Sequence, residues 1–369
     1  MIYLDNAATT KIHPTVLGKM MPYMTEKFFN PSSLYSNYGE EIFVAKKNIA
    51  ELIGANPDEI YFTSGGSESN NWIFDCFKDR NIITSSIEHA SIYNKYRFLS
   101  DNDMIDAFDE NGNLNLDFLE EVCSFLDVDL VSIMYVNNEI GIIQDVKKIS
   151  DIVHKNGALF HTDAVQAIGH IKIDVKKDNI DFLSGSAHKF GGPKGIGFLY
   201  INSDVDKNII SPFIYGGNQN DGLRGGTYDM ASIVGMGEAA YIANIELDNT
   251  IDIIKKYKNV LYQNIKTTIP DIYFNSNITN DSGIISVTIR GIDANNLVVM
   301  LAERNIYVSA GSACHSGINK PSYVLKSIGL SDEDAKSTIR ISIGKDISYE
   351  ELYKFVEELK ECVEILRYC

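Results

Sequence analysis

A lysine and a carboxylate, each at the end of a short apolar run, are the first candidates for chemistry in this chain. Lys189 lies in SAHKFGGPKGIG (186–197) and Asp163 lies in HTDAVQ (161–166). Ligands of open α/β sheets bind at the carboxyl ends of the strands, so Asp163 there would face a cationic nitrogen. A lysine beside such a site forms a Schiff base once its pKa is lowered. A helix-capping aspartate and a solvated lysine are the alternatives.

Two glycine-rich segments are suited to binding an anion. TSGGSESNN (63–71) follows a short apolar run and opens a helical pattern, so Gly66 and Ser67 would stand where unpaired backbone N–H groups bind phosphate. RGGT (224–227) places Thr227 in a second such loop. The first segment, taken alone, is also typical of a plain turn with a serine N-cap, because a lone glycine-rich turn is a weak signal.

SAGSACHSG (309–317) sets Cys314 among small residues. Structural cysteines usually lie on apolar faces, so this setting favours an exposed, mobile thiol. His315 is adjacent and could act as a base, while an unreactive loop cysteine is the alternative from this motif alone. No CxxC pair occurs, so neither a zinc site nor a disulfide framework is indicated. The remaining cysteines are predicted to be ordinary thiols: Cys76, Cys123, Cys362 and Cys369.

Three further side chains could bind a ligand. His89 follows the strand-like run IITSS, where an imidazole could stack on a flat ring, and Asn138 follows LVSIMY and offers an amide. Arg340 lies in TIRISI, and a guanidinium binds a carboxylate through two parallel hydrogen bonds. Each of the three, taken singly, is more often structural than functional.

Helical and strand patterns alternate through the first two-thirds of the chain. Apolar spacing predicts helices over 36–53 and 146–156, closed by Gly54 and Gly157. The run LVSIMYV (130–136) is continuously apolar, typical of a strand buried on both faces. Strands separated by helices favour an α/β fold with a mainly parallel sheet. Further strands are expected at 59–63, 158–163, 181–184 and 195–201.

The last third of the sequence predicts a smaller α/β unit. A mostly helical stretch over 230–268 is expected to break near residue 248. The final helix should begin with a capping box, Ser348 with Glu351 three residues on. Strands and helices alternate between these two helical regions, with strands expected at 283–290, 307–309 and 338–343 and helices at 294–304 and 321–328.

Composition excludes several classes of protein. Hydrophobic residues make up 44% of 369, enough for a substantial core, and 33 basic against 50 acidic residues give a net charge of −17. Such a surface repels phosphate backbones and anionic lipid, so nucleic-acid and membrane-surface binding are not expected. No run approaches the ~18 apolar residues of a membrane span. The absence of a basic, apolar leader and the few scattered cysteines predict a cytoplasmic location.

The motifs together resemble the NifS/IscS-type cysteine desulfurases of the fold-type I pyridoxal-phosphate (PLP) enzymes. The resemblance implies a large PLP-binding domain over 15–250. It implies a small domain, formed by 1–14 and 251–369, that carries the mobile cysteine loop. The matching blocks, from residue 3 to 344, are LDNAATT, TSGGSESNN, EHAS, VNNEIGIIQDV, HTDAVQAIG, SAHKFGGPKGIG, GLRGGT, SAGSACHSG, PSYVLKSIG and TIRISIG.

The resemblance also assigns roles to single residues. Lys189 corresponds to the Schiff-base lysine, Asp163 to the partner of the pyridine nitrogen, and Cys314 to the persulfide-forming cysteine. His89 would stack on the cofactor ring and accept the thiol proton. The other implied contacts are Gln166 with the ring hydroxyl, Gly66, Ser67, Ser186 and His188 with the phosphate, Thr227 with the neighbouring subunit's cofactor, and Asn138 and Arg340 with the substrate carboxylate.

The implied reaction converts L-cysteine to L-alanine and leaves the sulfur on Cys314 as a persulfide. The implied partners are a second copy of the chain and a sulfur acceptor, such as an iron–sulfur scaffold or a tRNA-thiolation enzyme. The chain departs from the family pattern at Ser67, at RGGT and at His315, and it stops at Cys369, without the extension that helps longer members dock a scaffold. The alternatives are an aminotransferase, a selenocysteine lyase, or a PLP-bound sulfur-relay protein without turnover.

Overall fold

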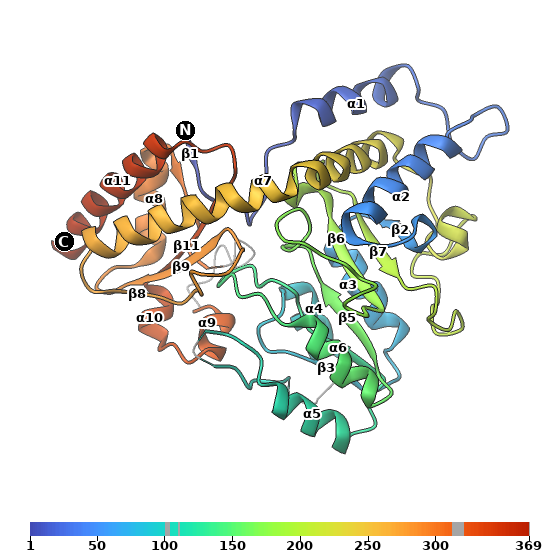
Figure 1. Cartoon of the computed structure of the whole chain (residues 1–369). Helices are drawn as coiled ribbons and strands as arrows, with labels where there is room; N and C mark the ends of the chain where they lie inside the picture. Colours follow the sequence, from blue (N-terminus) through green and yellow to red (C-terminus); the bar gives the residue numbers. More distant parts are fainter. Residues whose placement is uncertain (100–103, 110, 312–320, 369) are drawn as a thin grey trace.

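The computed structural model describes residues 1–99, 104–109, 111–311 and 321–368. Its central feature is a six-stranded sheet in the order β2-β7-β6-β5-β4-β3 (Figure 1). The neighbours from β3 to β6 pair in parallel, and only β7 runs against both of its neighbours. The expectation of a mainly parallel sheet is therefore confirmed. The strands are β2 Ile60–Thr63, β3 Ile82–Thr84, β4 Leu130–Ser132, β5 Leu159–Asp163, β6 Phe182–Ser186 and β7 Gly197–Ile201.

Both faces of this sheet are buried, which explains why its strands are continuously apolar. Side chains alternate across a strand. Thus Val131 and Leu183 join one core with helices α2, α6 and α7, whereas Leu130 and Phe182 join a second core with α3 and α4. The helices around this sheet are α1 Pro14–Thr25, α2 Gly39–Ile53, α3 Gly66–Cys76, α4 Ala90–Leu99, α5 Leu116–Phe125, α6 Val146–Lys155 and α7 Met230–Thr268.

A separate three-stranded antiparallel sheet, β11-β9-β8, lies in the other half of the molecule, where both termini are found (Figure 1). A third apolar core fills this half and includes Ile2 and Leu4 from the start of the chain, where β1 pairs with β10. The expected capping box is confirmed, because Ser348 and Glu351 exchange hydrogen bonds of 2.9 and 3.2 Å. The elements here are β1 Ile2–Tyr3, β8 Ile272–Phe274, β9 Ile284–Ile289, α8 Ala294–Glu303, β10 Ile306–Tyr307, α9 Tyr323–Ser327, α10 Asp332–Lys336, β11 Thr338–Ser342 and α11 Tyr349–Tyr368.

The expected break near residue 248 is wrong. Helix α7 is continuous over 39 residues and spans both halves (Figure 1). Neither glycine nor proline occurs in its second half, and Leu247, Ile251 and Ile254 stay buried through the polar stretch. The proposed division at residue 250 falls inside this helix, so that boundary stays a prediction.

Strand β4 is shorter than expected. It ends at Ser132, although Ile133 and Tyr135 still donate backbone hydrogen bonds to the carbonyls of His161 and Asp163, at 3.1 and 2.9 Å. The chain therefore stays extended beside β5 and carries Asn138 past the end of the sheet. Of the helices in the described ranges, none combines the length and apolar composition that a membrane crossing needs.

Candidate active site

Asp163 ends β5 and is 4% exposed. Its Oδ1 accepts a hydrogen bond from the backbone of Val165 at 3.0 Å, and its Oδ2 accepts one from Asn70 Nδ2 at 2.7 Å. Both oxygens are thus oriented by donors, and the bond from Asn70 also ties β5 to α3. The carboxylate is held at the carboxyl edge of the sheet, where the sequence places it.

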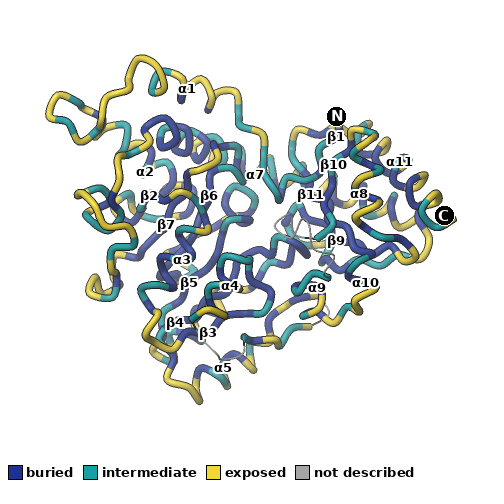
Figure 2. The backbone as a smooth tube through the Cα atoms, turned by 180° about the vertical axis from the view of Figure 1, so that it is seen from behind, coloured by how far each residue is buried: buried dark blue, intermediate teal, exposed yellow. Residues whose placement is uncertain are grey.

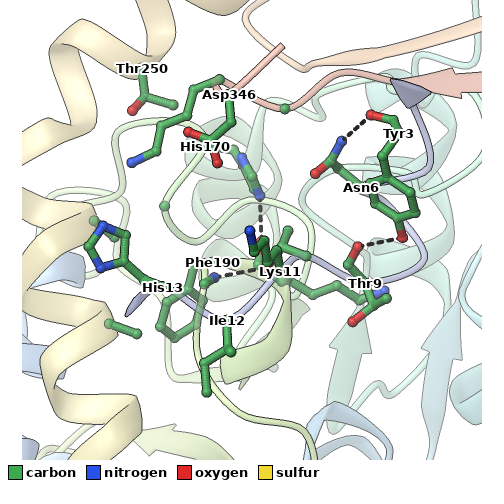
Figure 3. Close-up of a pocket in the computed structure, with 18 of the residues that line it drawn as sticks. Tyr3, Asn6, Thr9, Lys11, Ile12, His13, His170, Phe190, Thr250 and Asp346 are labelled. Carbon is green, nitrogen blue, oxygen red and sulfur yellow. Dashed lines mark hydrogen bonds between the residues drawn. The ribbon is translucent and has the colours of Figure 1, made fainter. Parts of the chain in front are cut away.

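Lys189 closes a short 3-10 turn directly after β6. Its Nζ donates to the backbone carbonyls of Ala7 and Ala8, and Gln166 Nε2 also donates to Ala7, at 2.8 Å. On the other side, His170 Nε2 donates to the Lys189 carbonyl at 2.9 Å, and burial lowers the pKa of His170 (Figure 3). The N-terminal segment and a neutral histidine therefore fix the lysine from two directions.

A cavity of about 740 Å³ lies behind Lys189, on the His170 side. Its walls come from the N-terminal segment, α7 and the residues after β11 (Figure 3). None of the predicted ligands Gly66, His89 and Asp163 lines it. Apart from Lys189, which lines it, the predicted cofactor contacts therefore lie outside this cavity.

Helix α3 begins at Gly66, immediately beside the Asp163 segment. A Cβ on Gly66 would lie 2.5 Å from Val165 Cγ2, and one on Gly65 would lie 3.6 Å from Ser186 Oγ. Only glycine allows the approach of Gly66 to Val165, and Gly65 has a φ of 150°. The N–H groups at the start of α3 lie close to the Ser186 hydroxyl, an arrangement that suits a cradle for an anion. Ser67 is the second residue of this helix.

His188 adds a neutral ring near this cradle. Burial, with smaller effects of Lys189 and Lys194, lowers its pKa to about 4. Its Nδ1 lies 3.1 Å from the Thr9 hydroxyl, and its carbonyl accepts from the backbone of Thr10 at 2.9 Å. At neutral pH this ring offers one N–H rather than a positive charge.

Arg224 ties the RGGT loop to α3 by a paired contact with Glu68, at 2.8 and 3.1 Å. Thr227, three residues on, is exposed. It is therefore accessible, and its predicted role toward a second subunit stays a prediction.

Arg340, on β11, comes from the other half of the molecule and is 2% exposed. It donates to the Asn138 carbonyl at 2.9 Å and to Asp5 Oδ1 at 2.7 Å. Its buried Nε has no hydrogen-bond partner within the part of the chain that the structure describes. A substrate carboxylate would supply that acceptor.

His89 begins a chain of polar contacts that leads back to Asp163. Its Nδ1 lies 2.8 Å from Ser91 Oγ, which accepts from Asn70 Nδ2 at 2.9 Å. Asn70 is 1% exposed. The sequence analysis included Asn70 in the TSGGSESNN motif and Ser91 in the EHAS block without giving either residue a role. Asp5 was missed in the same way, although it lies in the LDNAATT block.

Glu88, next to His89, is a buried carboxyl group. Its Oε1 accepts from Ser85 Oγ at 2.6 Å and from the backbone of Met134 at 2.9 Å. Burial raises its pKa to about 8, and the nearby Asp163 adds to this. Glu88 is therefore mostly protonated at neutral pH.

Cys314 and His315 lie outside the described residues. On either side of that segment, Ser309 exchanges backbone hydrogen bonds with Arg340 at 3.1 and 2.7 Å, and Ser322 Oγ donates to Glu139 at 2.6 Å. Both flanks are thus anchored near the predicted carboxylate site.

The described cysteines are poor nucleophiles. Burial raises the pKa of Cys123 to about 11 and also raises the pKa values of Cys76 and Cys362. The thiolate is the reactive form, so burial disfavours reaction at all three.

These side chains fit PLP: Asp163 suits a ring nitrogen that carries a proton, the start of α3 with Ser186 suits a phosphate, and Lys189 suits an aldehyde. The comparison with known families agrees. The chain belongs to the family described as Aminotransferase class-V, which matches residues 2–355. That family is PLP-dependent, so the predicted cofactor is confirmed.

The chain's relatives are cysteine desulfurases over nearly its full length. It is 39% identical to a cysteine desulfurase IscS from Methanosarcina thermophila, with 99% of this chain and 93% of the relative covered. A cysteine desulfurase IscS from Clostridium botulinum is 38% identical, with 98% and 95% covered. These matches confirm the predicted family and reaction class.

Solved structures give the same result. A NifS-like protein from Rickettsia africae has a TM-score of 0.90 and 34% identity, with 99% of each chain covered. A structure of SspA in complex with cysteine has a TM-score of 0.79 and 33% identity, with 94% of this chain and 99% of that chain covered. The predicted fold is confirmed.

Proposed function

We propose that this PLP-dependent cysteine desulfurase transfers the sulfur of L-cysteine to Cys314 and releases L-alanine. The observation that carries the proposal is the meeting of Asp163, Lys189 and the start of α3 at one sheet edge, with Arg340 reaching in from the other half. The full-length similarity to cysteine desulfurases and to SspA, solved with cysteine, supports the same substrate.

Bound PLP withdraws electrons from the substrate Cα. Asp163 holds a proton on the ring nitrogen, which strengthens that withdrawal. Arg340 and Asn138 bind the substrate carboxylate and so fix the orientation of Cα. Lys189 follows β6 in a short 3-10 turn, and its amino group would carry the proton to and from Cα.

The Cys314 thiolate then attacks the substrate sulfur. A sulfur–sulfur bond forms, the carbon–sulfur bond of cysteine breaks, and the carbon skeleton takes up protons to leave as alanine. Cysteine plus thiol thus gives alanine plus persulfide, with no outside oxidant. The raised pKa values of the described cysteines support Cys314 as the nucleophile.

We further propose a homodimer. Large apolar side chains on α1, α2, their connection and α7 are exposed in the single chain. Figure 2 shows the backbone of α1 and of its connection to α2 as largely exposed. Exposed apolar surfaces of this kind mark interaction sites. Thr227, also exposed, is available to a second copy. The surface includes Leu17, Met21, Met24, Phe28, Phe29, Leu34, Tyr35, Phe43, Val44, Tyr241 and Ile245.

The sulfur acceptor is proposed to be an iron–sulfur scaffold or a tRNA-thiolation enzyme. The relatives' name, IscS, supports the iron–sulfur scaffold. A cytoplasmic location is part of the same proposal. It is supported by the three free cysteines found among the described residues, because a reducing compartment keeps thiols unpaired.

The test is alanine release from L-cysteine by PLP-loaded protein with a thiol reductant. Wild type should release alanine and Cys314→Ala should not, while Cys123→Ala, a buried control, should keep its activity if it folds. Alanine from Cys314→Ala at the wild-type rate would refute Cys314 as the nucleophile. No alanine from any variant, in protein that has bound PLP, would refute the reaction and favour an aminotransferase.

A further inference from the structure

The polar contacts between Asp163 and His89 have directions that can be assigned one by one. Asp163 Oδ2 accepts, so the group of Asn70 that faces it at 2.7 Å is the amide NH₂. The same nitrogen lies 2.9 Å from Ser91 Oγ and gives its second hydrogen there. Ser91 Oγ accepts this bond and keeps its own proton, which it can donate to His89 Nδ1 at 2.8 Å.

A second contact fixes the histidine independently. The backbone N–H of Ser91 points at His89 Nδ1 over 3.2 Å, and a backbone N–H can only donate. Nδ1 therefore accepts two hydrogen bonds. A neutral imidazole with an accepting Nδ1 carries its proton on Nε2. Protonating Nδ1 as well would set two N–H groups head to head.

We propose that Asn70 and Ser91 are positioning residues that hold His89 as the neutral tautomer with its proton on Nε2. His89 then acts as a hydrogen-bond donor toward cofactor and substrate, and it does not accept the Cys314 thiol proton, contrary to the expectation from the sequence. This inference rests on the proposed function, which places the cofactor beside His89. Asn70 links the same tautomer to the Asp163 carboxylate, so one buried amide orients both groups.

Nuclear magnetic resonance of ¹⁵N-histidine-labelled holoenzyme reads the tautomer directly, and the chain has only seven histidines. The His89 signals, assigned by loss in His89→Gln, should show a bare Nδ1 and a protonated Nε2 at the assay pH. Ser91→Ala should shift them toward a mixture, whereas Ser91→Thr, which keeps the hydroxyl, should restore them. A wild-type signal with the proton on Nδ1, or on both nitrogens, would overturn the proposal.

Kinetics give the second reading. Loss of one neutral hydrogen bond should lower kcat for alanine release roughly 3- to 10-fold in Ser91→Ala, with KM for cysteine little changed. Ser91→Thr should recover the rate, and Ser124→Ala, an exposed serine on α5, should match wild type. Asn70→Ala should reproduce Ser91→Ala if it folds. An unchanged tautomer and an unchanged kcat in Ser91→Ala would refute the positioning role.

Absence of alanine in wild type would refute the proposed function, while the nuclear magnetic resonance experiment would still decide the tautomer of His89.

Discussion

Glu88 offers a test of the site's electrostatics through stability alone. The change is Glu88→Gln, which keeps the size of the side chain and the acceptor for Ser85 and Met134 but removes the ionisable group. Glu88 is fully buried, and its pKa is raised from 4.5 to about 8. The folded protein therefore holds this proton over a pH range in which the unfolded chain has lost it.

The sign and size of the pH dependence follow from the difference in proton binding between the folded and unfolded states. Between pH 4.5 and 8 the folded state binds more protons at Glu88 than the unfolded state, so wild-type stability falls as pH rises. One pKa unit is equivalent to about 1.4 kcal/mol, which makes the full cost of the raised pKa roughly 5 kcal/mol. The free energy of unfolding of Glu88→Gln, relative to wild type, should rise by on the order of 3–4 kcal/mol between pH 5 and 8.

Urea unfolding at several pH values measures this difference. The glutamine NH₂ group takes the place of Glu88 Oε2, which has no hydrogen-bond partner among the described residues. This adds a contribution that does not vary with pH to the difference in free energy of unfolding between the variant and wild type. Glu121→Gln, at an exposed position, is the matched control and should give a flat line. A flat or falling difference for Glu88→Gln would mean that Glu88 is ionised throughout, with its two donors outweighing burial.

Three further outcomes are expected. Lys189→Ala should lose the visible absorption band of covalently held PLP and all alanine release, and full activity would refute its role. Gly66→Ala places a Cβ 2.5 Å from Val165, so PLP affinity measured by titration should weaken, by on the order of 1–3 kcal/mol; unchanged affinity would remove α3 from the phosphate site. Arg340→Lys loses the forked contact, and KM for cysteine should rise roughly 10- to 100-fold; an unchanged KM would place the carboxylate elsewhere.

The sequence predicts most of the sheet because strands buried on both faces must be apolar throughout. The run at 130–136 is an exception, because its hydrogen bonding to β5 continues irregularly after Ser132. Helix α7 shows the opposite error: a break was expected near residue 248, but the helix is continuous there and Leu247 and Ile251 are buried. Local polarity alone does not report such tertiary burial.

Site residues were predictable where a strand end or a glycine identifies them, as with Asp163, Lys189 and Gly66. Asn70 and Ser91 carry no such signal, because their roles arise from a contact between α3 and α4 that no local pattern encodes. The pairing of Asp5 with Arg340 was equally hidden, since 335 positions separate the two residues. Polar pairs between residues so far apart in the sequence can be identified only from the three-dimensional structure.

The first ten residues contact several predicted site residues: Asp5 contacts Arg340, Ala7 and Ala8 contact Lys189, and Thr9 contacts His188. During synthesis this segment leaves the ribosome before its partner on β11, which emerges more than 300 residues later. At about 5–20 residues per second, that is a wait of roughly 15 seconds to a minute. A partly made chain that lacks β11 therefore has no complete site, and the enzyme can acquire its activity only after residues 5–9 and β11 have met.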